Sequence, residues 1–402
     1  MNSRALSFLT AMLVSLCVAV NVSYAVDDDC NNIKSAVDEV IGPVMLQYGI
    51  PGMVVGIVTR GGHYVFDYGV VSKETRKPVT GDTLFEIGSI SKTFTATLVS
   101  YAQANGALSL SDTASKYLSS LQGSHFDKVS LLNLGTHTSG GLPLQVPEEI
   151  TNNDQLMEYF RNWKPTYAPG TYRTYSNLSI GMLGMIAARS MNEDFVALMQ
   201  GKLFPALGMN HTYLDVPSSE RKNYAQGYTK NDEPIRMVPG VLASETYGIR
   251  TTADDMVHFV EANLGMFSLN EKLQRALIAT HTGYFRIGEM TQDLIWEQYS
   301  YPVALKDLLA GNSAKISYEA NPVIEIAPPS PPRENVVINK TGSTNGFAAY
   351  VAFIPEKALG IVLLANKNYP IDARVMVAHQ ILNRLDTDNV SRGTINLNRY
   401  LN

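Results

Sequence analysis

The sequence predicts an α+β protein, an α/β sandwich in which both ends of the chain build one antiparallel sheet with flanking helices. Two observations favour this fold. Strand-like runs, each next to a helix-like run, occur near both termini, and a long, mostly helical or irregular segment separates them. We therefore expect a discontinuous sheet-and-helix domain from residues 26–85 and 333–402, with a mainly helical domain, residues 86–332, inserted into it and a site at their interface.

The first 25 residues predict a secretory signal peptide that is cleaved after Ala25. Arg4 is their only charged residue, Ala5–Val20 is almost entirely apolar, and the small residues Ser23 and Ala25 precede the cleavage point. The apolar run is shorter than a helix that spans a membrane. We expect an exported, periplasmic protein that has no membrane association after cleavage.

A helix and a β-hairpin are expected at the start of the mature chain. Apolar residues recur at helical spacing over residues 31–48, and a glycine and a proline just beyond should end that helix. Two strand-like runs follow, Met53–Thr59 and His63–Val71. They are joined at Gly61-Gly62, which indicates a tight turn and therefore a hairpin.

Three strands and a helix are expected at the other end of the chain, where they would complete the sheet. The Pro-rich segment Pro328–Pro332 is interpreted as the connection that returns to this domain. The strands are Val336–Lys340, Gly346–Ile354 and Gly360–Ala365, and the helix that follows carries Val375, Ala378, Leu382 and Leu385 on one face.

Composition excludes several classes of function. Of 402 residues 45% are hydrophobic and 17% charged, so the chain can bury a large core. Lys and Arg number 32 against 37 Asp and Glu, without a block of like charge, which argues against a nucleic-acid partner. Cys30 is the single cysteine after signal cleavage, so we expect no intramolecular disulfide. The seven histidines show no metal-binding spacing and no nucleotide-binding loop is present, so we expect no metal and no cofactor.

Three short motifs carry the chemistry. Ser89-x-x-Lys92 stands at the start of an expected helix, where its spacing places both side chains on one face. The N-terminus of such a helix stabilises an oxyanion that forms on an attacked carbonyl. Tyr175-Ser-Asn177 lies between a turn and an apolar run, and Lys340-Thr341-Gly342, the only such triplet in the chain, ends an expected strand.

Each motif alone has a plainer interpretation. Ser219–Lys222 also matches the first pattern and Tyr400–Asn402 the second, while Lys-Thr-Gly at a strand end can be an exposed edge with a tight turn. Chance does not readily produce all three motifs in this order, with the first on an expected helix and the last on an expected strand.

Together these motifs resemble the serine β-lactamase and penicillin-binding-protein superfamily, and specifically the class C β-lactamases. The resemblance covers nearly the whole mature chain and implies the β-lactamase/transpeptidase-like fold. The segments that carry it are Gly88–Lys92, Gly141–Pro147, Tyr175–Asn177, Lys340–Gly342 and Leu364–Pro370.

The resemblance implies that Ser89 attacks the β-lactam carbonyl to form an acyl-enzyme, with the backbone N–H groups of Ser89 and Ser343 as the oxyanion hole. A serine hydroxyl needs a base, which is either Lys92 as a neutral amine or Tyr175 as a phenolate. Each must lose about three pKa units, or roughly 4 kcal/mol. Lys92 and Lys340 on either side of Tyr175 would supply much of that energy, and the cluster should titrate as one coupled unit.

Deacylation is expected to depend on Tyr175. Class A enzymes use a glutamate to activate the water and have Ser-Asp-Asn as their second motif. The second motif here is Tyr-Ser-Asn, which resembles class C, where the tyrosine is proposed to activate water. The substrate is expected to be a small-molecule β-lactam, either a penicillin or a cephalosporin, whose hydrolysis gives antibiotic resistance.

The resemblance also implies two sets of substrate-binding residues. Gln145 and Asn177 would hydrogen-bond the acylamino side chain of the β-lactam, and Tyr247 would form the aromatic wall of that pocket. The carboxylate would meet Lys340, Thr341 and Gly342, with Asn368 and Arg374 nearby, unless Arg374 is only a solvated helix residue. Ile371 is a departure, because many class C enzymes carry an asparagine there that reaches toward the carboxylate.

Two alternatives share the motifs. A D-alanyl-D-alanine carboxypeptidase or an esterase can have the same fold, and a penicillin sensor would acylate and then stop. No membrane anchor through which a sensor could signal is apparent after the signal peptide. No association surface stands out in the sequence either, so we expect a monomer.

Overall fold

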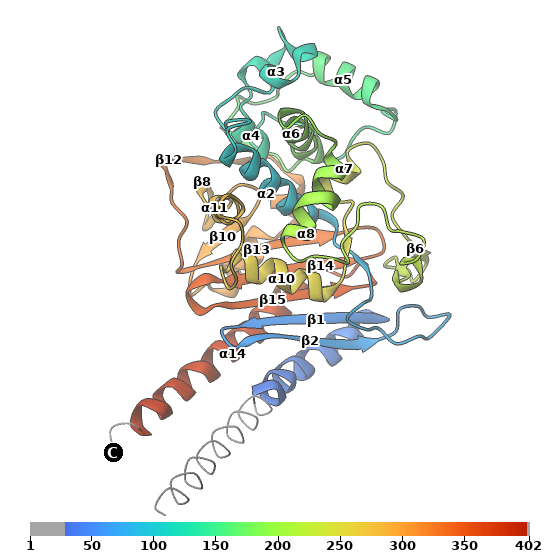
Figure 1. Ribbon diagram of the computed structural model, residues 1–402, viewed down its shortest axis with the longest axis vertical. Helices are drawn as coiled ribbons and strands as arrows, with labels where there is room; N and C mark the ends of the chain where they lie inside the picture. The colour runs from blue at the N-terminus through green and yellow to red at the C-terminus, as the bar shows by residue number, and fades with distance from the viewer. Residues whose placement is uncertain (1–28, 400–402) are drawn as a thin grey trace, which may run out of the picture.

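The computed structural model describes residues 29–399 (Figure 1). A nine-stranded antiparallel sheet, in the order β12-β8-β9-β10-β13-β14-β15-β1-β2, forms its centre. Helices cover both faces, and a helical region extends from one of them. The strands are β1 Gly52–Thr59, β2 Gly62–Gly69, β8 Gly283–Ile287, β9 Met290–Gln292, β10 Glu297–Ser300, β12 Ile324–Ser330, β13 Val336–Ser343, β14 Ala348–Ile354 and β15 Leu359–Ala365.

The middle strands are apolar on both sides because both faces of the sheet are covered. Val351 and Phe353 of β14 join the core beneath the helical region, whereas Tyr350 and Ala352 join the core on the opposite face. This alternation follows from the two-residue period of a strand. Two cores, one on each side of the sheet, therefore hold the layers together.

The helices near the two chain ends lie on the same face of the sheet (Figure 1). The first spans residues 29–48 and buries Ile33, Val37 and Ile41, as its spacing predicted. The last, α14, spans Ile371–Arg399 and is joined by α12, Leu305–Gly311. The other face is covered by α10, Ala253–Asn263, beside α11, Glu271–Ala279, and α2, Ser91–Ala104.

Helix α2 runs through the centre of the helical region and is buried along almost its whole length. It contacts α6, α9 and α11. The remaining helices are α3 Ala114–Tyr117, α4 Leu131–Gly135, α5 Asn153–Asn162, α6 Asn177–Ser190, α7 Phe195–Leu198, α8 Phe204–Ala206, α9 Ala243–Thr246 and α13 Ala314–Tyr318. Short strand pairs join β3 Phe85–Glu86 to β7 Arg250–Thr251, β4 Tyr172–Arg173 to β11 Asn321–Pro322, and β5 Gly227–Tyr228 to β6 Pro234–Ile235.

The fold class is confirmed, but the boundary expected at residue 333 is wrong for the sheet. Strands β8, β9, β10 and β12 belong to the segment expected to be helical, and they extend the sheet beyond β13. Of these, β9 and β10 are short and rich in polar residues, so they lack the pattern that marks a strand. Pro328 and Pro329 lie in β12, an edge strand, where a missing backbone donor is tolerated.

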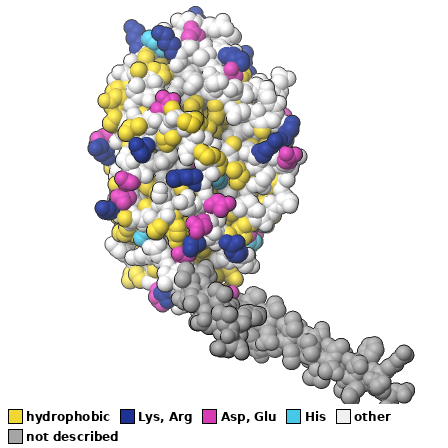
Figure 2. Space-filling view, turned by 90° about the vertical axis from the view of Figure 1, so that its left-hand side faces the viewer, with side chains coloured by type: hydrophobic (Ala, Val, Ile, Leu, Met, Phe, Trp, Pro, Cys, Tyr) yellow, Lys and Arg dark blue, Asp and Glu magenta, His cyan; other side chains and the backbone are white. Residues whose placement is uncertain are grey.

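Charges are mixed on the face drawn in Figure 2, where Lys and Arg are interspersed with Asp and Glu without an extended patch of one sign. None of the helices within residues 29–399 is long and apolar enough to cross a membrane. The expected signal peptide lies outside the described residues, as does the second Tyr-x-Asn match at residues 400–402.

Candidate active site

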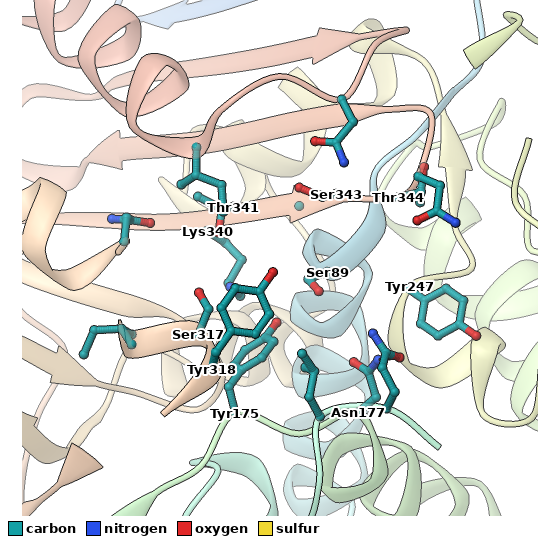
Figure 3. A pocket seen from close by; sticks show the side chains of 18 of the residues that line it. Ser89, Tyr175, Asn177, Tyr247, Ser317, Tyr318, Lys340, Thr341, Ser343 and Thr344 are labelled. Carbon is teal, nitrogen blue, oxygen red and sulfur yellow. The ribbon is translucent and has the colours of Figure 1, made fainter. Parts of the chain in front are cut away.

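A pocket opens between the sheet and the helical region, and most of the residues expected at the site line it (Figure 3). Ser89 lies between Tyr175 and Lys340 on one side and Tyr247 on the other. The lining residues include Ser89, Gln145, Tyr175, Asn177, Tyr247, Lys340, Thr341, Gly342, Ser343, Asn368 and Ile371. Ser219 of the second Ser-x-x-Lys match lies exposed on a surface loop instead.

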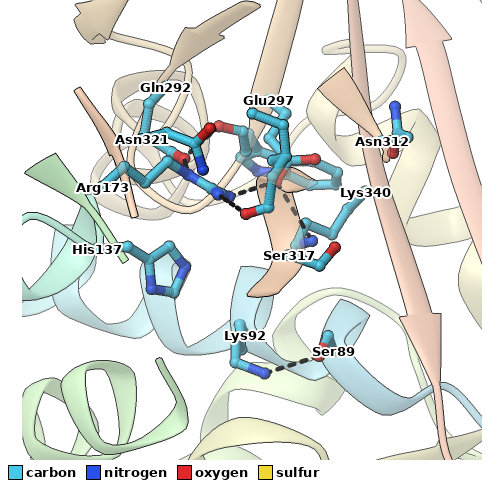
Figure 4. A network of polar contacts seen from close by, with 12 residues as sticks. Ser89, Lys92, His137, Arg173, Gln292, Glu297, Asn312, Ser317, Asn321 and Lys340 are labelled. Atoms are coloured by element: carbon cyan, nitrogen blue, oxygen red, sulfur yellow. Dashed lines mark hydrogen bonds and ion pairs between the residues drawn. The ribbon is translucent and has the colours of Figure 1, made fainter. Parts of the chain in front are cut away.

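Ser89 is held in a single 3₁₀ turn, Gly88–Ile90, directly before α2. Lys92, which is fully buried, donates a hydrogen bond from Nζ to Ser89 Oγ at 2.8 Å and another to the backbone oxygen of Thr246 at 3.0 Å. Figure 4 shows the first of these bonds. The three-residue spacing therefore joins the serine and the lysine directly.

Two glycines let the turn that carries Ser89 lie against the end of β13. A Cβ on Gly88, which has φ 51°, would lie 2.5 Å from Ser343 N. A Cβ on Gly342 would lie 1.9 Å from the backbone oxygen of Ile87. Since real Cβ atoms do not approach so closely, both positions require glycine. The backbone of Ser343 is thereby brought beside Ser89, as an oxyanion hole would need.

Tyr175 lies among cations. Nζ of Lys92 is 5.3 Å and Nζ of Lys340 is 5.1 Å from the centre of its ring, and the Arg173 guanidinium carbon is 5.3 Å from it. The Tyr175 hydroxyl is buried and makes no hydrogen bond of ordinary geometry with the described residues, although Ser89 lies close enough to favour its ionised form. A phenolate at this position would be stabilised mainly by charge.

The two candidate bases have similar acidities. Burial would raise the pKa of Tyr175, but Lys340 and then Lys92 outweigh it and lower that pKa to about 8. Burial lowers the pKa of Lys92 to about 8, and Lys340 adds to this, while Tyr175 opposes it. Because the two groups interact, their protonation steps belong to the pair and not to either residue alone.

A buried ion network supports this arrangement (Figure 4). Glu297 Oε1 accepts from Arg173 Nη2 at 2.9 Å and lies 3.7 Å from Lys340 Nζ. Arg173 Nε also donates to Gln292 Oε1 at 2.6 Å, and its Nη1 donates to the backbone oxygen of Ile316 at 2.8 Å. Glu297 partly offsets the lysines and raises the pKa of Tyr175. The carboxylate thus compensates two buried cations and limits their effect on the tyrosine.

The opposite side of the pocket is built at the start of α6. Asn177 Nδ2 donates to Gln145 Oε1 at 2.8 Å, and the Asn177 backbone N–H donates to the backbone oxygen of Leu144 at 2.8 Å. Ser176 caps the helix by accepting from the backbone N–H of Ser179. The helix cap therefore places both amides together, with Tyr247 at the end of α9 nearby.

Arg374, which we expected near the carboxylate of the substrate, is not among the residues that line the pocket. It is 1% exposed, so it is not a solvated helix residue either. Nη1 donates to Gly342 O at 2.7 Å and to Ser343 Oγ at 2.8 Å, Nη2 donates to Asn368 Oδ1 at 3.0 Å, and Nε donates to Tyr369 O at 3.1 Å. Burial lowers its pKa to about 10, so it remains charged at neutral pH. Arg374 braces the end of β13 from behind the pocket.

Ile371, by contrast, does line the pocket, and its apolar side chain brings no donor there. Lys340, Thr341 and Asn368, which also line the pocket, have side chains that can donate hydrogen bonds. Within residues 29–399 no group of three or more His, Cys, Asp or Glu side chains is arranged to hold a metal ion.

Several residues of the site were not identified from the sequence. Arg173 precedes Tyr175 by two residues, and that proximity was the only available signal. Glu297 lies on a short polar strand and His137 was one of seven unremarkable histidines, so neither could be singled out. Tyr318, 75% exposed at the mouth of the pocket, also had no signal.

The chain is similar to known proteins in sequence and in overall structure. The family model described as "Beta-lactamase" matches residues 37–386. A β-lactamase of Pseudomonas fluorescens is 49% identical over 355 residues, which cover 88% of this chain and 99% of that protein. A solved class C β-lactamase in complex with cefoxitin is 53% identical, with a TM-score of 0.87, over 88% of this chain and 99% of that one. A solved D-alanine carboxypeptidase from Burkholderia cenocepacia is 56% identical, with a TM-score of 0.85, over the same shares.

Proposed function

The chain belongs to the β-lactamase family and is a class C serine β-lactamase that hydrolyses β-lactams, and from this premise we propose that Ser89 forms the acyl-enzyme. The observation that carries the proposal is the 2.8 Å hydrogen bond from Lys92 Nζ to Ser89 Oγ in a pocket that also contains Tyr175 and Lys340. Ser89 Oγ attacks the carbonyl carbon, the ring C–N bond breaks, and the ring nitrogen takes a proton.

The base is the Lys92–Tyr175 pair with one proton between them. With two protons the pair has no basic site, and with one it has either a neutral amine or a phenolate. Both forms carry the same number of protons, so pH alone does not distinguish them. Since both pKa values are about 8, kcat/KM should rise with pH along an acid limb set by loss of the first proton.

The substrate is held on both sides of Ser89. The backbone N–H groups of Ser89 and Ser343 stabilise the oxyanion, supported by the close approach of Gly88 to Ser343. Gln145, Asn177 and Tyr247 receive the acylamino side chain. Lys340, Thr341, Gly342 and Asn368 receive the carboxylate, while Arg374 acts by bracing Gly342, Ser343 and Asn368.

Arg374→Ala tests this last assignment. The free energy of unfolding should fall by about 3 kcal/mol, because a buried cation leaves and the groups it bonded lose their partner. If Arg374 does not touch the carboxylate, the ratio of kcat/KM for a cephalosporin to that for its methyl ester should equal the wild-type ratio. Thr341→Val, which alters a lining residue, should reduce the ratio. A ratio lowered in the Arg374 variant as much as in the Thr341 variant would contradict the assignment.

Cephalosporins and penicillins as substrates, the periplasm as the location and a monomeric state complete the proposal. The solved relative in complex with cefoxitin supports a cephalosporin substrate, and the leader-like first 25 residues support export. Hydrolysis in the periplasm would protect the cell from β-lactam antibiotics.

A second candidate, D-alanyl-D-alanine carboxypeptidase activity, is favoured by the solved relative named for that activity. Steady-state turnover of a penicillin, a cephalosporin and a peptide ending in D-Ala-D-Ala distinguishes the two, with intact mass recorded to detect an adduct. The β-lactamase should release many product molecules per active site from both drugs. One stoichiometric burst, a stable adduct and turnover of the peptide would instead support the carboxypeptidase.

A further inference from the structure

His137 contacts Tyr175 and both residues that flank it. The backbone oxygen of His137 accepts from the backbone N–H of Thr174 at 2.9 Å, and its Nδ1 accepts from the backbone N–H of Ser176 at 3.2 Å. Its ring centre lies 4.4 Å from that of Tyr175. We infer that His137 is a positioning residue that fixes the segment 174–176 and so sets the place of Tyr175 among Lys92, Lys340 and Arg173. This inference rests on the proposed role of Tyr175.

The ring of His137 must be neutral for this contact, and its tautomer follows. A backbone N–H is always a donor, so Nδ1 has to be the unprotonated acceptor and the proton lies on Nε2. Burial, and then Arg173, Lys92 and Lys340, hold the pKa of His137 well below its usual value. The acceptor therefore persists across the pH range in which Tyr175 and Lys92 titrate. Figure 4 shows His137 in this group of cations.

The position is costly for a histidine, which argues against a purely passive role. His137 has φ 60° just beyond the end of α4, in the left-handed conformation that favours glycine or asparagine. Its Nε2 is buried and has no hydrogen-bond partner among the described residues. Both features destabilise the fold, and the contacts to residues 174–176 offset them.

Tyr175 is poised by all the charged groups around it, so a small displacement should be measurable. Lys92 on α2, Lys340 on β13, Arg173 on β4 and Glu297 on β10 face it, and Ser89 lies beside it. Movement away from the two lysines weakens the attraction that lowers its pKa to about 8. Ionisation of Tyr175 therefore reports its position directly.

The test compares His137→Phe, which keeps a ring and removes the acceptor, with His137→Asn, which keeps an acceptor and tolerates the left-handed backbone. The readout is the ultraviolet absorbance of tyrosinate during a titration through pH 8, with Tyr175→Phe identifying the signal. Other described tyrosines with a perturbed pKa all have it raised, so they do not interfere. No substrate is needed, so this test can fail independently of the proposed function.

We expect the Phe variant to move the midpoint up from about 8 toward 10 and to lower kcat by about 10- to 100-fold, with the acid limb of kcat/KM moving in the same direction. The Asn variant should keep the wild-type midpoint and most of the rate. A folded Phe variant with the wild-type midpoint, or an Asn variant shifted as far as Phe, would overturn the inference. If the Phe variant does not fold, the Asn variant decides: an unchanged midpoint supports the inference and a raised one overturns it.

Discussion

Replacing Ser89 by alanine is expected to lower kcat/KM on every β-lactam by about 10⁴- to 10⁶-fold, as loss of the nucleophile does in other serine hydrolases. Ser89 Oγ is the atom that Lys92 Nζ contacts at 2.8 Å. Without it, Lys92 and Tyr175 have no hydroxyl from which to remove a proton. Intact mass should show no adduct with a slowly released inhibitor. Binding should persist, because the residues that line the rest of the pocket are unchanged.

The fold should survive this substitution. Lys92 keeps its 3.0 Å hydrogen bond to Thr246 O, and only one partner of its amine is removed. Ser219→Ala is the matched control, because Ser219 begins the second Ser-x-x-Lys match and lies exposed on the surface. Its rate and its adduct should equal those of the wild type. Turnover by Ser89→Ala within tenfold of wild type, or an adduct that still forms, would rule out Ser89 as the nucleophile.

Local patterns predicted those parts of the fold whose residues depend on near neighbours in the chain. The hairpin of β1 and β2 and the strands β13, β14 and β15 occur within a few residues of their expected limits. Their apolar residues show the periods that burial on a sheet imposes. Strands β8, β9 and β10 were missed because their residues are held by partners distant in the sequence, such as Glu297 by Arg173 of β4, and a single sequence does not display such pairs.

The contacts of the site also fall into two groups: those that local spacing predicts and those that only the fold creates. Ser89 and Lys92 lie three residues apart on one turn, so their contact could be predicted from spacing alone. The hydrogen bonds of Arg374 could not be predicted, because nothing in the sequence indicates which of its possible partners it bonds or that it is buried. His137 and Glu297 act through contacts that span tens to over a hundred positions, 39 for His137 with Ser176 and 124 for Glu297 with Arg173. Only the folded chain brings them to Tyr175.

Replacing Tyr175 by phenylalanine should separate the two steps of the reaction. Turnover should fall by about 10²- to 10⁴-fold, the range that general acid–base catalysis contributes. If Lys92 is the base for acylation and Tyr175 activates the water, acyl-enzyme should form and then accumulate, and intact mass would show it. If Tyr175 is the base for both steps, no adduct should accumulate. A variant that deacylates at the wild-type rate would contradict the assigned role of Tyr175 in water activation.

The pH dependence of the acylation that remains in the Tyr175→Phe variant is a second, independent test of the Lys92–Tyr175 pair. Along the acid limb the pair goes from two protons to one, and because both pKa values are about 8, both Lys92 and Tyr175 contribute to this first loss. The phenylalanine variant keeps only the Lys92 route, so its acid limb should move to slightly higher pH. The control is Tyr247→Phe, which removes a hydroxyl on the opposite side of the pocket and should leave the limb in place.

The Tyr175→Phe variant, although less active, should have a higher free energy of unfolding than the wild type at pH 7. The pKa of Tyr175 is about 8 in the folded chain and near 10 when unfolded, so its ionisation adds stability above pH 10 that is lost as pH falls through 8. At pH 7 the wild type therefore buries a neutral hydroxyl that makes no hydrogen bond of ordinary geometry with the described residues. Phenylalanine removes that penalty, and the variant should be more stable by about 1 kcal/mol at pH 7. Denaturant unfolding at pH 7 and pH 9 checks this, since the advantage must shrink at the higher pH. A Tyr175 variant less stable than wild type at pH 7 would mean that the hydroxyl supports the fold, and the cost attributed to its catalytic position would be wrong.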